Sequence, residues 1–79
     1  MAQISLESIR KIDKQRNNIH EKVDTTYTVF EDNGNKYVQF DTYGRIGRAY
    51  PEKISQSFQM DKESARYIVK LLIEEFDLL

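Results

Sequence analysis

The sequence predicts a single small α+β domain, in which an antiparallel sheet of three to four strands is covered by a C-terminal amphipathic helix and preceded by an N-terminal helix. Three observations lead to this prediction. A β-hairpin pattern surrounds Asn33 and Gly34, an alternating apolar pattern occupies residues 54–60, and a helical apolar stripe follows Asp61. At 79 residues the chain has room for one domain, so we expect residues 1–79 to fold together.

The composition is typical of an ordinary globular domain, with 39% hydrophobic and 32% charged residues. Because the chain has no cysteine and a single histidine, His20, we expect no disulfide, no metal and no cofactor. No apolar run reaches the roughly 20 residues that a membrane span needs. The first residues also lack the apolar region of a signal peptide. We therefore expect a cytoplasmic protein that does not bind membranes.

The hairpin of residues 25–43 is the best-defined element, because Asn33-Gly34 tolerates the positive φ angles of a type I′ turn. This turn places Tyr27 opposite Phe40 and Val29 opposite Val38. We expect the face formed by these four side chains to be buried under the C-terminal helix. The opposite face carries the remaining side chains, Thr28, Phe30, Tyr37, Gln39 and Asp41.

The N-terminal helix is predicted over residues 6–17. Ser5 is a suitable N-cap, and Ile4 and Ile9 stand at the positions of a hydrophobic staple. Ile9 and Ile12 form a narrow apolar stripe. We interpret the basic residues on the opposite side as a solvated face.

The second half of the chain predicts a strand followed by a helix. In residues 54–60, Ile54, Phe58 and Met60 alternate with polar residues, and we expect Ser55, Ser57 and Gln59 on the wet face of the sheet. Asp61 is a suitable cap for the helix. Its apolar stripe consists of Ala65, Ile68, Val69, Leu72, Ile73 and Phe76. Apolar residues beyond that stripe, Leu71, Leu78 and Leu79, favour a helix-mediated homodimer.

Catalytic chemistry is not indicated. The three glycines are scattered, so no phosphate-binding loop is present. No serine has a histidine or lysine placed to activate it, and neither Asp24 nor Asp41 has a companion for acid–base catalysis. We expect a protein that is not an enzyme.

Residues 44–53 form the least regular segment, with two of the three glycines and the only proline. Basic residues interleave here with aromatic ones, a combination typical of single-stranded nucleic acid sites, where cations hold phosphate and rings stack on bases. A polar loop with its arginines in water is the alternative interpretation. The formal net charge of −1 argues against strong binding to duplex phosphate.

Residues 36–72 resemble the positive cofactor four family of single-stranded-DNA-binding transcriptional coactivators. The likeness lies in the strand KYVQFDTYGR, a loop ending in Pro51 and Lys53, the strand ISQSFQM and the capped helix DKESARYIVKLL. It covers about half of the chain, and Ile54-Ser55 stands where the family has a glycine. The resemblance implies an α+β dimer whose curved antiparallel sheet binds single-stranded nucleic acid.

Two functional hypotheses follow. In the first, the chain binds single-stranded nucleic acid, with cations on phosphate and tyrosines stacked on bases. The cations are Arg45, Arg48 and Lys53, and the tyrosines are Tyr37, Tyr43 and Tyr50. In the second, it is a protein-interaction module, such as a small adaptor or an inhibitor encoded by a mobile element. Its contact surface would be the Phe30/Tyr37 pair or the acidic end of the last helix, Glu74, Glu75 and Asp77.

Overall fold

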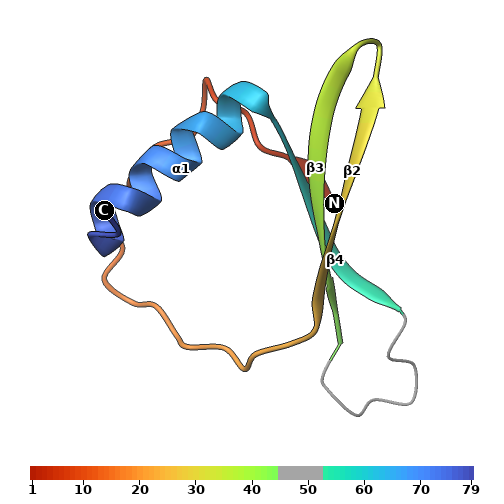
Figure 1. Cartoon of the computed structure of the whole chain (residues 1–79). Helices are drawn as coiled ribbons and strands as arrows, with labels where there is room; N and C mark the ends of the chain where they lie inside the picture. Colours follow the sequence, from red (N-terminus) through yellow and green to blue (C-terminus); the bar gives the residue numbers. More distant parts are fainter. Residues whose placement is uncertain (45–52) are drawn as a thin grey trace.

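The computed structural model describes residues 1–44 and 53–79, which form a four-stranded sheet and one helix (Figure 1). The elements are β1 (Ala2–Gln3), β2 (Thr25–Asp32), β3 (Asn35–Tyr43), β4 (Ile54–Asp61) and α1 (Lys62–Phe76). The strand order is β1-β4-β3-β2. The predicted α+β class is confirmed. The prediction of a purely antiparallel sheet is wrong, because β1 pairs in parallel with β4. This pairing supplies partners for backbone groups on the outer edge of β4 that would otherwise be unpaired.

The hairpin between β2 and β3 has the predicted turn and register. Asn33 and Gly34 both adopt positive φ angles, 50° and 79°, as a type I′ turn requires. Tyr27 lies opposite Phe40, and Val29 lies opposite Val38. Turn chemistry therefore set the pairing of the whole hairpin.

The pairing of β4 with β3 extends the two faces of the hairpin across a third strand. Val38 pairs with Met60 and Phe40 with Phe58, and the Phe40 and Phe58 rings stack with centroids 5.3 Å apart. Directly opposed residues share a face. The apolar face, as we name it, therefore comprises Tyr27, Val29, Val38, Phe40, Phe58 and Met60. The polar face comprises Thr26, Thr28, Phe30, Asp32, Tyr37, Gln39, Asp41, Tyr43, Ser57, Gln59 and Asp61.

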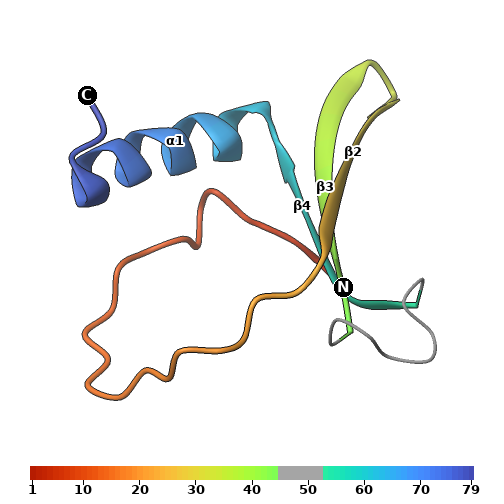
Figure 2. The same ribbon diagram turned by 60° about the horizontal axis from the view of Figure 1, so that its bottom comes forward.

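The apolar face is not buried, contrary to the sequence prediction. Tyr27 is 68% exposed and Val29 is 52% exposed. Within the two described ranges, no hydrophobic side chain is buried at all. Figures 1 and 2 show the reason, because α1 leaves the end of β4 and points away from the strands in both views.

Helix α1 itself begins and ends as its sequence indicates. The Asp61 side chain accepts a hydrogen bond from the Ser64 backbone N–H at 2.9 Å, which makes Asp61 the N-cap. At the other end Asp77 adopts a left-handed conformation, and the Leu78 N–H donates to the Ile73 carbonyl at 3.1 Å. The described part of the chain contains no helix long and apolar enough to cross a membrane.

The predicted N-terminal helix is absent. Residues 4–24 contain one hydrogen-bonded turn, in which the Ser8 N–H donates to the Ser5 carbonyl at 3.1 Å. The segment runs out from β1 and returns to β2, and Lys11 pairs with Glu75 of α1 on the way (Figure 2). Ile12 is exposed and Ile9 is only half-buried, so the narrow apolar stripe is covered in part. A helix of this length needs fuller packing to be stable in water.

Candidate functional site

The structure brings two of the six predicted contact residues onto one surface. Tyr37 and Tyr43 both lie in β3 and point to the polar face of the sheet. Lys53 is exposed and comes directly before β4. Arg45, Arg48 and Tyr50 lie outside the described residues. The polar face is therefore the candidate site.

An aromatic side chain stands at each end of the polar face, and each is held by a neighbour on β2. Tyr37 stacks on Phe30, with ring centroids 5.4 Å apart and planes inclined by 20°. The Tyr43 hydroxyl is hydrogen-bonded to the Thr26 hydroxyl at 2.9 Å. Five residues of extended strand lie between the two tyrosines, and the six steps from Tyr37 to Tyr43 span about 20 Å. Both rings are half-buried, so their positions are constrained.

The middle of the polar face is a chain of uncharged donors that ends on a buried carboxylate. The Gln59 amide donates to Gln39 at 2.7 Å, and the Gln39 amide donates to Asp41 at 2.9 Å. The Ser57 hydroxyl donates to the same Asp41 oxygen. Asp41 is only 6% exposed, so the groups that the centre of the face presents to solvent are mainly the Gln39 and Gln59 amides.

Only part of this series of hydrogen-bonded side chains could be predicted from the sequence. The prediction that Gln39 and Asp41 share one face of the sheet is confirmed. The prediction that Ser57 lies on the wet face in contact with water is wrong, because Ser57 is buried. The pairing of Asp41 with Ser57 depends on the register between β3 and β4. The sequence offers no two-residue turn signal that would define that register, because ten residues separate Tyr43 from Ile54.

A shallow depression of about 260 Å³ adjoins these amides. It lies where β1 approaches the polar face. The lining residues are Met1, Ala2, Gln3, Gln39, Ser57 and Gln59. Amide groups beside an open depression can donate hydrogen bonds to the polar groups of a ligand and accept hydrogen bonds from them.

Charged groups stand at both ends of the polar face. Asp32 and Asp61 stand at the hairpin-turn end, where Asp61 pairs with Tyr37 across the strands. The Ser64 backbone and side chain donate hydrogen bonds that lower the pKa of Asp61, so this carboxylate stays ionised. Lys53 stands at the opposite end of β4. Asp24 also stands near the Tyr43 end, because its backbone carbonyl accepts a hydrogen bond from the Tyr43 N–H at 3.0 Å. Both ends of the face therefore carry acidic and basic groups.

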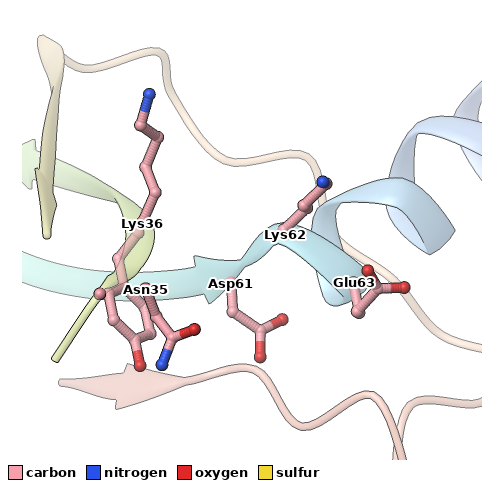
Figure 3. Close-up of a pocket in the computed structure, with 7 residues that line it drawn as sticks. Asn35, Lys36, Asp61, Lys62 and Glu63 are labelled. Carbon is pink, nitrogen blue, oxygen red and sulfur yellow. The ribbon is translucent and has the colours of Figure 1, made fainter. Parts of the chain in front are cut away.

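A second depression, of about 410 Å³, lies between the hairpin turn and the start of α1. Figure 3 shows that Lys36 and Lys62 extend to one side of β4, whereas the Asp61 carboxylate extends to the other. Glu63 also lines the depression, so positive and negative side chains balance. The two ammonium groups do not converge on a common point, and this is not a phosphate site.

The described residues contain no group of three or more His, Cys, Asp or Glu side chains that could hold a metal ion. No family model, curated protein or solved structure matches the chain. Its function is therefore inferred from the sheet and from the sequence that surrounds it.

Proposed function

We propose that this chain is a non-enzymatic module that binds single-stranded nucleic acid on the polar face of its sheet. One observation carries the proposal. Tyr37 and Tyr43 share a strand and a face, and the side chains between them are an amide and a buried carboxylate rather than exposed charges. A sheet face with separated aromatic rings and neutral hydrogen-bonding groups suits unstacked bases.

The predicted cations indicate where the phosphates would lie. Lys53 stands at the Tyr43 end of the sheet, and Arg45 and Arg48 precede it in the sequence by eight and five residues. The acidic groups Asp32 and Asp61 stand at the other end. We therefore place the bound strand from Tyr43 toward the Gln39 and Gln59 amides. The likeness of residues 36–72 to the positive cofactor four family also supports this class of ligand.

A protein-interaction module is the second candidate, and the free edge of the sheet favours it. Strand β2 is the last in the order β1-β4-β3-β2, and its eight residues include no proline and no lysine. An open edge of this kind can accept an extended peptide as a further strand. The stacked Phe30/Tyr37 pair lies beside that edge and would supply side-chain contacts.

Titration of labelled oligo-dT at two salt concentrations distinguishes the two candidates. Nucleic acid binding should weaken steeply with salt and be lost in the triple variant Arg45→Glu, Arg48→Glu, Lys53→Glu. Removing three phosphate contacts should also reduce the slope of log K against log salt by about 2. The matched control is Lys62→Glu, Arg66→Glu, Lys70→Glu, which makes the same charge change on α1. Absence of binding at low salt would leave the protein-interaction module.

Tyrosine variants test the stacking surface separately from charge. Tyr43→Leu should weaken oligo-dT binding by about 5- to 150-fold, the range expected when one stacked base is lost. Tyr43→Phe keeps the ring and should bind like the wild type, although it loses the hydrogen bond to Thr26. Tyr67→Leu, on the helix, is the control for loss of a tyrosine elsewhere. Equal weakening in Tyr43→Leu and Tyr67→Leu would contradict the proposed surface.

A further inference from the structure

Two apolar surfaces of this chain are only partly covered in a single copy, because Val38 and Phe40 on the sheet and Ile68 on the helix are half-buried while their neighbours are exposed. The first is the apolar face of the sheet, on which Tyr27 and Val29 are more than half exposed. The second is the stripe of α1, on which Val69 is 55% and Phe76 is 70% exposed. Both belong to regular elements, a strand paired with β3 along its whole length and a capped helix, so their exposure does not come from irregular backbone.

The accessible surface area of the chain is larger than that of a compact monomer. The chain has an accessible surface of 7501 Å² and a mass of 9.4 kDa. A compact monomer of that mass exposes about 5,000 Å², so about 2,500 Å² is in excess. An obligate dimer buries about 1,000–2,500 Å² per partner. The radius of gyration, 14.9 Å, likewise exceeds the roughly 11.6 Å of a compact chain of this length.

The helix is held away from its own sheet at the point where it begins. Asp61 is both the last residue of β4 and the N-cap of α1, so no residue is left over to form a hinge. Ser64, in the first turn, is 1% exposed and donates from its hydroxyl to the Ile4 carbonyl at 3.4 Å. A different direction of α1 would move Ser64 away from Ile4 and break this hydrogen bond.

We propose that a second copy of this chain completes the hydrophobic core. The helix stripe of each copy covers the apolar face of the other, in a reciprocal contact around a two-fold axis. The dimensions agree. Helix α1 has 15 residues and is about 22 Å long and 10 Å wide. The apolar face spans three strands of eight or nine residues, about 27 Å long and 10 Å across between the outer strands.

A second copy is favoured over an unrelated partner because the chain carries both complementary surfaces. One isologous contact covers the sheet and the helix of both copies at once. The excess surface, to which the extended residues 4–24 also contribute, is large enough to include such an interface. The polar face lies on the other side of the sheet and stays free. Self-association is therefore independent of the proposed nucleic acid binding and can be measured without a nucleic acid.

Sedimentation equilibrium of single-residue variants tests the reciprocal arrangement. The wild type should have twice the 9.4-kDa chain mass. Val29→Asp on the sheet and Val69→Asp on the helix should each raise the dissociation constant at least about tenfold, because each places a charge in the interface. The matched controls are Thr28→Asp and Lys70→Asp, one residue away on the outward-facing sides, and both should stay dimeric. Monomeric wild type that unfolds cooperatively would overturn the proposal, as would a Val29→Asp variant that dimerises like the wild type.

Cross-linking tests the same contact without loss of the fold. Tyr27 is replaced by p-benzoylphenylalanine, and this chain is mixed with an isotopically labelled wild-type chain before irradiation. We expect cross-linked peptides that join β2 of one copy to α1 of the labelled copy. Cross-links that join β2 only to α1 of the same chain, or to no helix, would contradict the reciprocal contact.

Discussion

At the scale of single residues, Asp41 organises the centre of the polar face. Its carboxylate accepts hydrogen bonds from Ser57 on the neighbouring strand and from Gln39 on its own strand. A buried carboxylate is stable only when its oxygens are hydrogen-bonded in this way. Asp41 therefore holds β3 and β4 in register and positions the Gln39 amide, which makes its role structural.

Replacing Asp41 with alanine should destabilise the protein. The Ser57 hydroxyl loses its acceptor in a buried position, which should lower the free energy of unfolding by about 1–3 kcal/mol. Urea denaturation at a fixed protein concentration measures the change. Asp13→Ala, at an exposed position in the irregular N-terminal segment, should stay within about 0.5 kcal/mol of the wild type. Equal losses in the two variants would show that the buried carboxylate contributes nothing special.

Gly34 is the second residue with a defined physical role, because its φ angle of 79° is one that side chains rarely allow. A Cβ at this position would meet no atom within 4 Å, so any cost of Gly34→Ala comes from the backbone alone. We expect a loss of about 1–2 kcal/mol in urea denaturation. Asn35→Ala, at the next and exposed position, is the control. A neutral Gly34→Ala would mean that the turn has changed its conformation.

At the scale of elements, the junction between β4 and α1 determines the shape of the molecule. Asp61 ends the strand and caps the helix, and Ser64 attaches the first helical turn to Ile4. The direction of α1 is therefore set by hydrogen bonds at its start rather than by packing of its apolar stripe. The N-terminal segment shows the opposite case, because it has a suitable helix cap in its sequence but too narrow an apolar stripe to stabilise a helix by packing.

The cap should make helix content sensitive to acid. The pKa of Asp61 is lowered below its ordinary 3.8 by the hydrogen bonds from Ser64, so the stabilisation is complete above pH 3.8. It is lost as the pH falls through the lower pKa of the folded state. Asp61→Asn caps the helix without ionising and should remove this part of the pH dependence of the helical circular dichroism signal. The same acid profile in Asp61→Asn and in the wild type would contradict this assignment.

At the scale of the whole molecule, the described residues form regular elements without a buried hydrophobic core. Secondary structure of this kind is not stable in isolation, because apolar burial is the main favourable term in folding. The sheet has one apolar and one polar face, and we assign one proposed role to each. Self-association would use the first face, and nucleic acid would bind to the second.

Thermal stability should depend on protein concentration if the core is shared between two copies. A tenfold increase in concentration should raise the Tm by about 3–5 °C, because dimer formation is coupled to folding. Differential scanning fluorimetry over a hundredfold concentration range measures this shift. A constant Tm over that range would show that each copy folds alone.

Much of the local structure could be predicted from the sequence. The Asn33-Gly34 turn, the register of β2 with β3, strand β4 and the Asp61 cap all follow from interactions between residues close in the chain. Two tyrosines of the candidate site, Tyr37 and Tyr43, could be placed on one face by the same alternation.

The remaining features depend on contacts between distant segments. The parallel pairing of β1 with β4, the burial of Ser57 against Asp41 and the outward direction of α1 have no signal in any short stretch of sequence. The amphipathic pattern of α1 showed correctly that the helix has an apolar side. A hydrophobic pattern indicates that one side of an element is buried. It does not indicate which other surface buries it, because the hydrophobic effect is non-directional.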